Sequence, residues 1–386
     1  MSRTFVGLSL GSSLEGIDAA VVRVVGIGLG AVPRLERTAR LPIAVSVREE
    51  YQLSRALAEA ASQAVRHVVI QSGCSAREVF AIGLLDPAHP VGDRFANWPE
   101  VADRIAEITG LTVVHGFRGR DRAAGGSGHP ITAASDFLLL SSDVEDRLLI
   151  HLGAVSSVLF IPANAKVQSL HGFETGPGSQ LLDSILFHGT RGKELTDPGG
   201  KKAVQGRCLE SLLTRWLEHP HLTRKPPKAV QPEAFGRAFL HGVFDAARDL
   251  GAGLPDLLCT ISHFIARSLG EAWRGGLPAG QPRVLVSGGG VRNGFLWQLL
   301  GQQFEGTPIA RTDEAGLPAT ARNSAAAAIL ATLTCDGVPG NLAPLTGAVG
   351  GRVLGQVVPG DSRNWARCTA WLAEQAGDYS RAVRAA

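Results

Sequence analysis

The sequence is poor in the residues that hold metal ions or form disulfide frameworks. Its 386 residues include five cysteines, none in a Cys-x-x-Cys spacing, and these are Cys74, Cys208, Cys259, Cys335 and Cys368. An odd, scattered set indicates neither a zinc site nor a disulfide-stapled fold. The 11 histidines do not cluster at metal-binding spacing, so the sequence identifies no metal ligands.

Aromatic residues and surplus charge are also scarce. Aromatics make up 6% of the chain, and 38 Lys and Arg against 35 Asp and Glu leave a net charge of +3. A nucleic-acid-binding face needs a broad basic surface with aromatic platforms, so we expect no nucleic-acid partner. No apolar run reaches the roughly 20 residues that cross a bilayer, and the N-terminus lacks a signal-peptide layout. We therefore expect no membrane segment and a cytoplasmic location.

The chain is rich in the residues that build a globular α/β protein. Hydrophobic residues make up 45% of it and glycines number 47, enough for a sizeable core with many tight turns. Since single domains usually run to about 100–200 residues, the length favours two lobes.

Hydrophobic periodicity in the first 140 residues predicts a mixed α/β sheet. Three strands come first, followed by helix, strand, helix and strand, which is typical of a mostly parallel sheet with an antiparallel edge. The predicted strands are 4–9, 17–25, 34–43, 79–85 and 111–116, and the predicted helices are 47–70 and 99–109. A polar, glycine-rich loop at 116–130 interrupts the pattern.

The same opening pattern returns about 140 residues later. Predicted strands lie at 147–153, 156–163, 167–173 and 283–290, and predicted helices at 178–189, 201–218, 233–249, 256–274, 293–304, 320–334 and 363–377. The repetition predicts two related lobes with a ligand-binding cleft between them. We expect an N-terminal lobe at 1–140 and a C-terminal lobe at 141–359, with a C-terminal helix at about 360–380 that could pack back on the first lobe.

Two glycine-rich turns could approach a phosphate group. The segment GLSLGSSLEGIDAA, residues 7–20, joins two predicted strands, and its backbone N–H groups and serine hydroxyls could face an anion. The segment RVLVSGGGVRNGFLWQLL, residues 283–300, is a strand, a turn of three glycines and a helix. Either turn could instead be an ordinary connection without a ligand.

Two further segments carry charged groups that could act on a substrate. Glu174, in HGFETGPGSQLLD at 171–183, follows a predicted strand and could serve as a general base, or it could be a solvated loop residue. Arg118, Arg120 and Arg122 flank Asp121 in the glycine-rich loop. Arginine forks suit carboxylate or phosphate recognition, although a surface loop with ion pairs of its own is the commoner explanation for any one of these arginines.

Taken in order along the chain, these segments resemble the 1,6-anhydro-N-acetylmuramic acid kinases. GSSLEGIDAA is similar to Gly-Thr-Ser-Leu-Asp-Gly-Val-Asp-Ala, and FRGRDRAAGGSGHP to Phe-Arg-x-x-Asp-x-Ala-x-Gly-Gly-x-Gly-x-Pro. GFETGPGSQLLD resembles Gly-Phe-Asp-Thr-Gly-Pro-Gly-Asn-x-Leu-x-Asp, and VSGGGVRNGFLWQLL resembles Cys-Gly-Gly-Gly-x-x-Asn-x-x-Leu. The tail GVPGNLAPLTGA at 337–348 is similar to Gly-Leu-Pro-Gly-Asn-Leu-Pro-x-Val-Thr-Gly-Ala.

The resemblance implies a two-lobed actin-like ATPase fold of the ribonuclease H-like type, with mixed sheets flanked by helices and a central cleft. It implies a homodimeric kinase that uses ATP and Mg²⁺ to phosphorylate the sugar and open its anhydro ring with water, in cell-wall recycling. Glu174 would be the catalytic base, and Arg118, Arg120 and Asp121 would shape the sugar side. The residues implied for ATP binding are Gly11, Ser12, Ser13, Leu14, Glu15, Gly16, Ile17, Asp18, Gly153, Gly176, Gly178, Gly288, Gly289, Gly290 and Asn293.

The sequence also departs from the family pattern. Glu174 stands where the family has Asp, HLGAVSS at 151–157 replaces Asn-Ile-Gly-Gly-Ile-Ala-Asn, His-Gly-Gln-Thr is absent, His115-Gly116 replaces Gly-Asp, and Asn323 replaces an acidic residue. These changes suggest an altered substrate or weakened catalysis. The alternative is a catalytically impaired relative that binds a nucleotide, a sugar or a partner protein.

Overall fold

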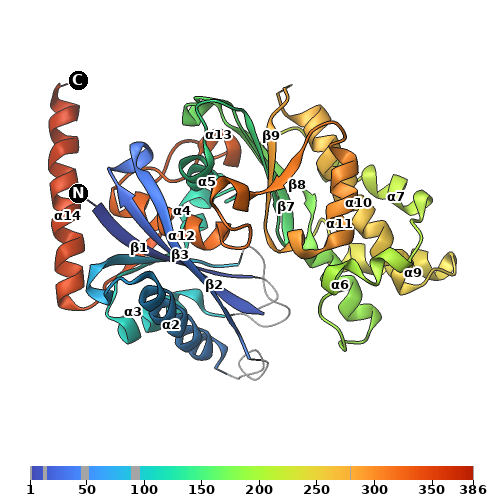
Figure 1. Ribbon diagram of the computed structural model, residues 1–386, viewed down its shortest axis with the longest axis horizontal. Coiled ribbons are helices and arrows are strands. Elements are labelled where there is room, and N and C mark those ends of the chain that lie inside the picture. Colours follow the sequence, from blue (N-terminus) through green and yellow to red (C-terminus); the bar gives the residue numbers. More distant parts are fainter. Residues whose placement is uncertain (1, 12–14, 45–51, 88–95, 279, 386) are drawn as a thin grey trace. The chain divides into compact units, whose positions relative to one another are not determined.

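The computed structural model describes residues 2–11, 15–44, 52–87, 96–278 and 280–385, with side chains as far as Gln375. It contains two compact units, Met1–Leu140 with Ala321–Ala386, and Ser141–Thr320. Each unit is an α/β structure with one mixed sheet (Figure 1). Among the described residues, no helix combines the length and apolar character that crossing a membrane would require.

The sheet of the first unit has six strands in the order β11-β5-β4-β1-β2-β3. β1 lies antiparallel to β2 and parallel to β4, β2 lies antiparallel to β3, and β4 lies parallel to β5. The elements of this unit are β1 (Ser2–Leu10), β2 (Gly16–Val25), β3 (Val32–Pro42), α2 (Leu53–Ser72), β4 (Val79–Leu85), α3 (Trp98–Thr109), β5 (Val113–His115), α4 (Phe117–Ala123), α5 (Ala133–Leu140), α12 (Arg322–Cys335), α13 (Ala343–Thr346), β11 (Gln356–Val358) and α14 (Ser362–Ala385).

The sheet of the second unit has five strands in the order β10-β9-β6-β7-β8. β6 lies antiparallel to β7 and parallel to β9, β7 lies antiparallel to β8, and β9 lies parallel to β10. The elements of this unit are β6 (Arg147–Leu152), β7 (Val155–Ile161), β8 (His171–Pro177), α6 (Ser179–Gly189), α7 (Glu210–Leu217), α8 (Pro220–Thr223), α9 (Arg237–Asp249), α10 (Leu254–Gly276), β9 (Arg283–Ser287), α11 (Gly294–Gln303) and β10 (Ile309–Arg311).

Five strands of the first sheet therefore have the same order and directions as the five of the second. Numbered within each unit, both sheets read 5-4-1-2-3, with the first three strands antiparallel and the fourth and fifth parallel to the first. The predicted repetition of the strand–turn–strand opening is confirmed at the level of topology, and the two-lobed actin-like α/β fold class with it.

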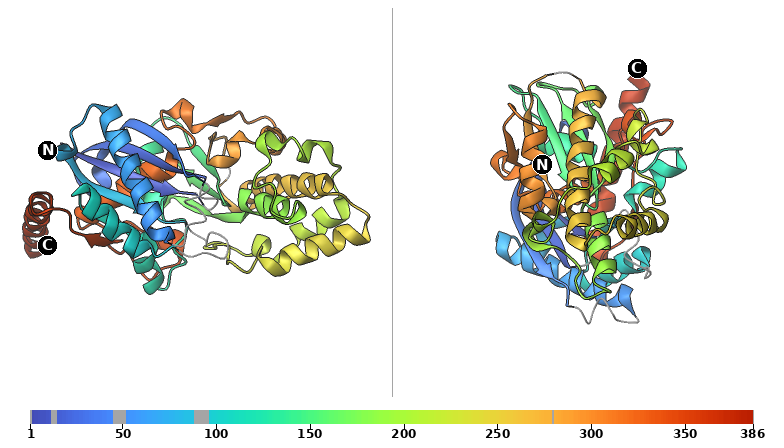
Figure 2. Two further views of the ribbon diagram at one scale, coloured as in Figure 1. Left: turned by 90° about the horizontal axis from the view of Figure 1, so that it is seen from below. Right: turned by 90° about the vertical axis from the view of Figure 1, so that its right-hand side faces the viewer.

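The first sheet is covered on both faces because side chains alternate along its strands. Val6, Leu8 and Ile82 pack with α2 and α3, which lie side by side in Figures 1 and 2. On the opposite face, a side chain at Gly7 would lie 1.8 Å from the carbonyl oxygen of Ser324 in α12, and one at Gly83 would lie 2.0 Å from that of Ala327. Only glycine on these strands lets α12 approach so closely.

This packing explains a difference from the predicted division of the chain. The sequence groups residues 321–359 with the second lobe, whereas the structure groups them with the first unit. α12 is the buried helix on the first sheet, and β11 extends that sheet beside β5. A helix that is apolar all round is predicted to be buried, but its sequence does not indicate which sheet covers it.

The loop predicted at 116–130 is partly helical in the structure. Residues Phe117–Ala123 form α4, which starts after Gly116 in a left-handed conformation at φ 65°. Arg118, Arg120 and Asp121 are therefore presented by a short helix, because the buried Phe117 anchors its first turn in the core.

Candidate functional site

In the second unit, the β6–β7 turn is held by the N-terminus of α6. The carbonyl oxygen of Gly153 accepts hydrogen bonds from the backbone N–H of Ser179 at 2.8 Å and from its hydroxyl at 3.1 Å. A side chain at Gly178 would lie 2.2 Å from the same oxygen, so residue 178 must be glycine for the helix to approach the turn. Two of the residues predicted to bind ATP, Gly153 and Gly178, therefore lie together.

The three-glycine turn after β9 lies against this same place. Gly288 has φ 97°, and a Cβ atom there would lie 2.4 Å from the carbonyl oxygen of Leu152; a Cβ at Gly290 would lie 2.7 Å from the Cβ of Leu152. A Cβ at Gly289 would meet nothing within 4 Å, and this residue is exposed. The fold thus requires glycine at 288 and 290, whereas nothing in the described residues requires it at 289.

His151 lies at the centre of this cluster, and no role was predicted for it from the sequence. Its Nδ1 is 3.0 Å from the hydroxyl of Ser287, and a side chain at Gly153 would lie 2.6 Å from its Nε2. Ser287 is itself buried at the end of β9. The imidazole and hydroxyl therefore bridge the two glycine turns. His151 stands where the family pattern has asparagine.

Asn293 lies at the start of α11, and the oxygen of its side-chain amide is engaged by the helix. Its side-chain oxygen accepts a hydrogen bond from the backbone N–H of Leu296 at 3.0 Å, which makes it an N-cap. Gly200 approaches it so closely that a Cβ there would lie 2.3 Å from that oxygen. Its capping role accounts for an asparagine at this position independently of any ligand.

Glu174 lies in β8 and is buried, with 6% of its surface exposed. Its Oε2 accepts a hydrogen bond from the backbone N–H of Val230 at 2.7 Å, and its backbone N–H donates to the carbonyl oxygen of Lys228 at 3.3 Å. The segment that follows α8 therefore lies beside the acid and fixes its backbone and one carboxylate oxygen. The sequence placed Glu174 in a turn after a strand, whereas it lies within the strand.

Two buried basic residues accompany Glu174. The Nε2 of His221 is 3.0 Å from the carbonyl oxygen of Glu174, and since a carbonyl only accepts, Nε2 carries the hydrogen. Burial lowers the pKa of His221 to about 4. Burial also lowers the pKa of Lys228 to about 8; its Nζ donates to the carbonyl oxygens of His221 and Leu222 at 3.0 and 2.9 Å. His221 is therefore neutral at pH 7.

In the first unit, the β1–β2 turn is described only at its ends, and Ser12, Ser13 and Leu14 lie outside the described residues. Gly11 is exposed, while Gly16 is buried, with its Cβ position 2.9 Å from the carbonyl oxygen of Leu41. Ile17 is a fully buried core side chain, so only its backbone could meet a ligand. At Gly11, Gly16 and Ile17, a ligand could therefore contact only backbone atoms.

Two carboxylates follow this turn and share one arginine. Arg40 lies 3.2 Å from a carboxylate oxygen of Asp18 and 3.8 Å from one of Glu15. Within the described part of the chain, no group of three or more His, Cys, Asp or Glu side chains could hold a metal ion. A metal here would therefore need oxygen ligands from a bound phosphate in addition to the protein.

On α4, Asp121 is fully buried and its carboxylate is fully engaged. One oxygen accepts from the amide of Asn341 at 2.6 Å and from the hydroxyl of Thr346 at 2.7 Å, and the other accepts from the backbone N–H of Gly128 at 2.7 Å. Asp121 therefore ties α4 to the segment 341–346, and the structure gives it a positioning role. The motif at 337–348 contains Asn341 and Thr346, but its sequence does not indicate that both side chains bind the carboxylate of Asp121.

The two arginines predicted for the sugar side differ in their contacts. Arg118 is buried, donates to the carbonyl oxygen of Asp86 at 2.8 Å and lies 3.4 Å from the Asp86 carboxylate. Arg120 is exposed, and its guanidinium makes no hydrogen bond or ion pair with any residue that the structure describes. Arg120 is thus the one of the pair whose guanidinium has no protein partner there.

Comparison with known proteins gives a family match over nearly the whole chain. The family model described as anhydro-N-acetylmuramic acid kinase matches residues 3–360. The chain is 32% identical to the anhydro-N-acetylmuramic acid kinase of Gloeobacter violaceus, covering 92% of this chain and 98% of the relative. It is 34% identical to that of Synechococcus elongatus, covering 91% and 98%.

The solved structures that this chain matches are more distant in sequence. A ROK family glucokinase from Streptomyces griseus, solved in complex with glucose and AMPPNP, has 14% sequence identity and a TM-score of 0.36, covering 85% of this chain and 98% of that one.

Proposed function

This chain belongs to the anhydro-N-acetylmuramic acid kinase family and is a sugar kinase, and from that premise we propose its reaction. ATP phosphorylates 1,6-anhydro-N-acetylmuramic acid on the 6-oxygen, and a water molecule opens the anhydro ring. The products are N-acetylmuramic acid 6-phosphate and ADP. The family match over residues 3–360 carries this proposal, because it spans both units and every glycine turn described above.

We propose that the nucleotide phosphates meet backbone N–H groups of the glycine turns. In the second unit, Gly178, Gly288 and Gly290 bring the turns together, and Gly289 is left exposed with space over it. A glycine that packing does not require is best explained by close approach of a ligand to the backbone. Phosphoryl-transfer enzymes act mainly by such positioning and charge stabilisation.

We propose that Glu174 takes the proton of the attacking water. The water oxygen bonds to C1 of the sugar, the bond from C1 to the bridging 6-oxygen breaks, and that oxygen accepts the γ-phosphoryl group as ADP leaves. The proton passes to the carboxylate, which the N–H of Val230 and the segment around Lys228 hold in place. A fixed carboxylate of this kind is a suitable general base.

The first unit offers residues that fit a magnesium ion, which the family's use of ATP implies. Mg²⁺ is usually bound by one or two carboxylates together with substrate phosphates, and Asp18 and Glu15 supply two carboxylates next to the β1–β2 turn. These two carboxylates would hold the ion, which would neutralise charge on the phosphates. Their ion pairs with Arg40 would break when the ion binds. Arg120 would bind the sugar's lactyl carboxylate, with Arg118 and Asp121 fixing α4.

The experiment is to incubate the full chain with ATP, Mg²⁺ and 1,6-anhydro-N-acetylmuramic acid in water enriched in ¹⁸O. We expect sugar-dependent release of ADP and one ¹⁸O atom at C1 of the phosphorylated product. Phosphorylation without ¹⁸O would contradict the ring-opening step, and nucleotide binding without sugar-dependent ADP release would favour the impaired relative that the sequence left open.

We also propose that the enzyme is a homodimer and acts in the cytoplasm, where ATP is available. Light scattering of the purified chain measures the first, and a mass of one chain, 40.5 kDa, would contradict it.

A further inference from the structure

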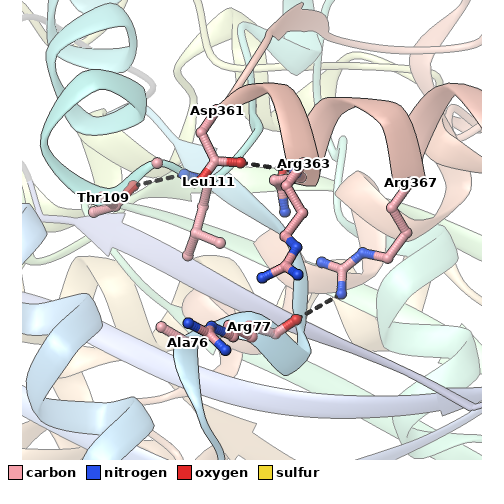
Figure 3. A pocket seen from close by; sticks show the side chains of 9 residues that line it. Ala76, Arg77, Thr109, Leu111, Asp361, Arg363 and Arg367 are labelled. Atoms are coloured by element: carbon pink, nitrogen blue, oxygen red, sulfur yellow. Dashed lines mark hydrogen bonds between the residues drawn. The ribbon is translucent and has the colours of Figure 1, made fainter.

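A pocket in the first unit gathers arginines from distant parts of the sequence. It has a volume of about 430 Å³ and lies where the start of α14 meets the loop after α3 and the turn at Ala76–Glu78. Its lining includes Arg77, Arg363, Arg367 and Asp361 (Figure 3). None of these residues belongs to the glycine turns or to the residues assigned to the kinase reaction.

One arginine is fixed by the protein. Arg367 donates from Nη1 to the carbonyl oxygen of Arg77 at 2.7 Å and from Nη2 to that of Val79, and its guanidinium lies 5.3 Å from the ring centre of Phe80. Its Nε is buried and has no hydrogen-bond partner. A buried donor without an acceptor is costly, so this guanidinium is held in place with part of its hydrogen-bonding capacity unused.

The guanidinium groups of the other two arginines have no protein partner in the described part of the chain. The side chains of Arg77 and Arg363 are exposed, and neither guanidinium makes a hydrogen bond or an ion pair there. Figure 3 shows the guanidinium of Arg363 in the space between those of Arg77 and Arg367. Like charges that line one pocket repel one another, and an anion bound there would offset this repulsion.

The single acid of the lining does not supply that counter-charge. Asp361 accepts a hydrogen bond from the backbone N–H of Asn364 at 2.7 Å and therefore caps α14. Glu78, the acid next to Arg77 in the sequence, accepts from the backbone N–H of Ser75 at 2.6 Å. Three arginines and one aspartate leave the lining with a charge of +2, to which the start of a long helix adds a partial positive charge.

We propose that this pocket binds a small molecule carrying a phosphate group. A phosphate dianion matches the charge of the lining, and its oxygens accept from guanidinium forks in parallel pairs. The volume is in the range of small-molecule sites, roughly 300–1,000 Å³. The ligand would join the start of α14 to the turn before β4, because Arg363 comes from the helix and Arg77 from the turn.

The experiment is a calorimetric titration of the full chain with inorganic phosphate and, separately, with glucose 6-phosphate, in 150 mM sodium chloride. The test variant is Arg77→Ala with Arg363→Ala, two exposed side chains whose removal leaves no buried group unpaired. The control is Arg66→Ala, an exposed arginine of α2 that likewise has no partner among the described residues. Circular dichroism melting of each variant checks that it folds.

We expect the wild type and Arg66→Ala to bind phosphate with equal affinity, and the double variant to bind at least tenfold more weakly. Tighter binding of glucose 6-phosphate than of inorganic phosphate would identify a phosphorylated metabolite as the ligand, and the reverse would identify the free anion. Equal phosphate binding by the double variant and the wild type would overturn the proposal, as would a wild type that binds malonate but not phosphate. Phosphate bound at the proposed glycine turns contributes equally to both variants, so the difference between the double variant and Arg66→Ala reports on the pocket alone.

Discussion

The third strands of the two sheets occupy the same place in the strand order but lie in different surroundings. β3 is an edge strand with side chains that alternate between exposed and half-buried, and its Glu36 pairs with Arg23 at 2.8 Å at the surface. β8 is buried along six of its seven residues, and its Glu174 is covered. One topology therefore produces a partly exposed acid in the first unit and a buried acid in the second.

The difference comes from the chain segment that leaves each third strand. After β8, the chain forms α6 to α10 before it returns to the sheet, and the residues around Lys228 and Val230 lie on the strand itself. Burial changes the chemistry of a carboxylate because the charged form loses solvent stabilisation and depends on its hydrogen bonds. The chemistry of this fold therefore depends on which segments cover the repeated sheet.

The largest effect is expected when each of the two acids is neutralised in turn. We expect Glu174→Gln to lower kcat by about 10²–10⁴-fold, the usual contribution of a general base, with the KM for ATP unchanged. Steady-state ADP release measures both values.

The matched control is Glu36→Gln on β3. It removes a surface ion pair worth at most about 1 kcal/mol, so kcat should stay at the wild-type value. A Glu174→Gln enzyme as active as this control would show that the buried acid is not the base.

The second prediction concerns the glycine turn that the fold requires. Gly288→Ala should destabilise the protein by about 2–4 kcal/mol, because the new Cβ meets the carbonyl oxygen of Leu152 and φ is positive. Urea unfolding followed by circular dichroism measures the loss. A change below about 0.5 kcal/mol would mean that the β6 and β9 turns separate easily.

The third prediction uses the buried histidine beside Glu174. Its pKa in the folded protein, about 4, lies below the usual 6.5, so between these values only the unfolded chain binds the proton. Folding stability should therefore fall as the pH drops from 7 to 5, with His221 accounting for about 1–2 kcal/mol of the loss.

His221→Gln keeps a donor for the carbonyl oxygen of Glu174 and removes the titration. Its urea-unfolding free energy should lose less between pH 7 and pH 5 than that of the wild type. His67 is exposed, so His67→Gln should keep the pH dependence of folding stability seen in the wild type. Equal pH dependence in the two variants would contradict the role given to His221.

The smallest structural effect is expected at the neighbouring glycine. Gly289→Ala meets nothing within 4 Å, so the free energy of unfolding should change by less than about 0.5 kcal/mol. If the nucleotide approaches this backbone, the KM for ATP should rise about tenfold or more while the melting temperature stays constant. An unchanged KM would place the nucleotide elsewhere.

Much of the fold could be predicted from local patterns. The strand at 79–85 matches β4 at both ends, and the three-glycine turn lies between β9 and α11 as predicted. The predicted helix at 201–218 is wrong in its first half, where α7 begins only at Glu210. Gly206 lies against Pro255, with its Cβ position 2.1 Å from that carbonyl oxygen, and this contact with a distant helix overrides the local helical pattern.

The candidate site was less accessible than the fold. Motif order predicted roles for Glu174 and for the glycines of both turns, because turn chemistry is local. It did not reveal that His151 and Ser287 bridge the turns, nor that Asn341 and Thr346 engage the carboxylate of Asp121. These partners lie more than 130 residues apart in the chain, a separation at which no local spacing rule applies.

By itself, the sequence determined the α/β class, the repeated strand–turn–strand opening and the kinase family. Strand period, turn residues and motif order can all be recognised in the sequence without knowledge of long-range contacts. Only the tertiary structure decided that α12 covers the first sheet, which glycines packing requires, and that three arginines from two ends of the first unit line one pocket. Such facts depend on long-range contacts, and the free energy of those contacts arises when distant surfaces are buried together.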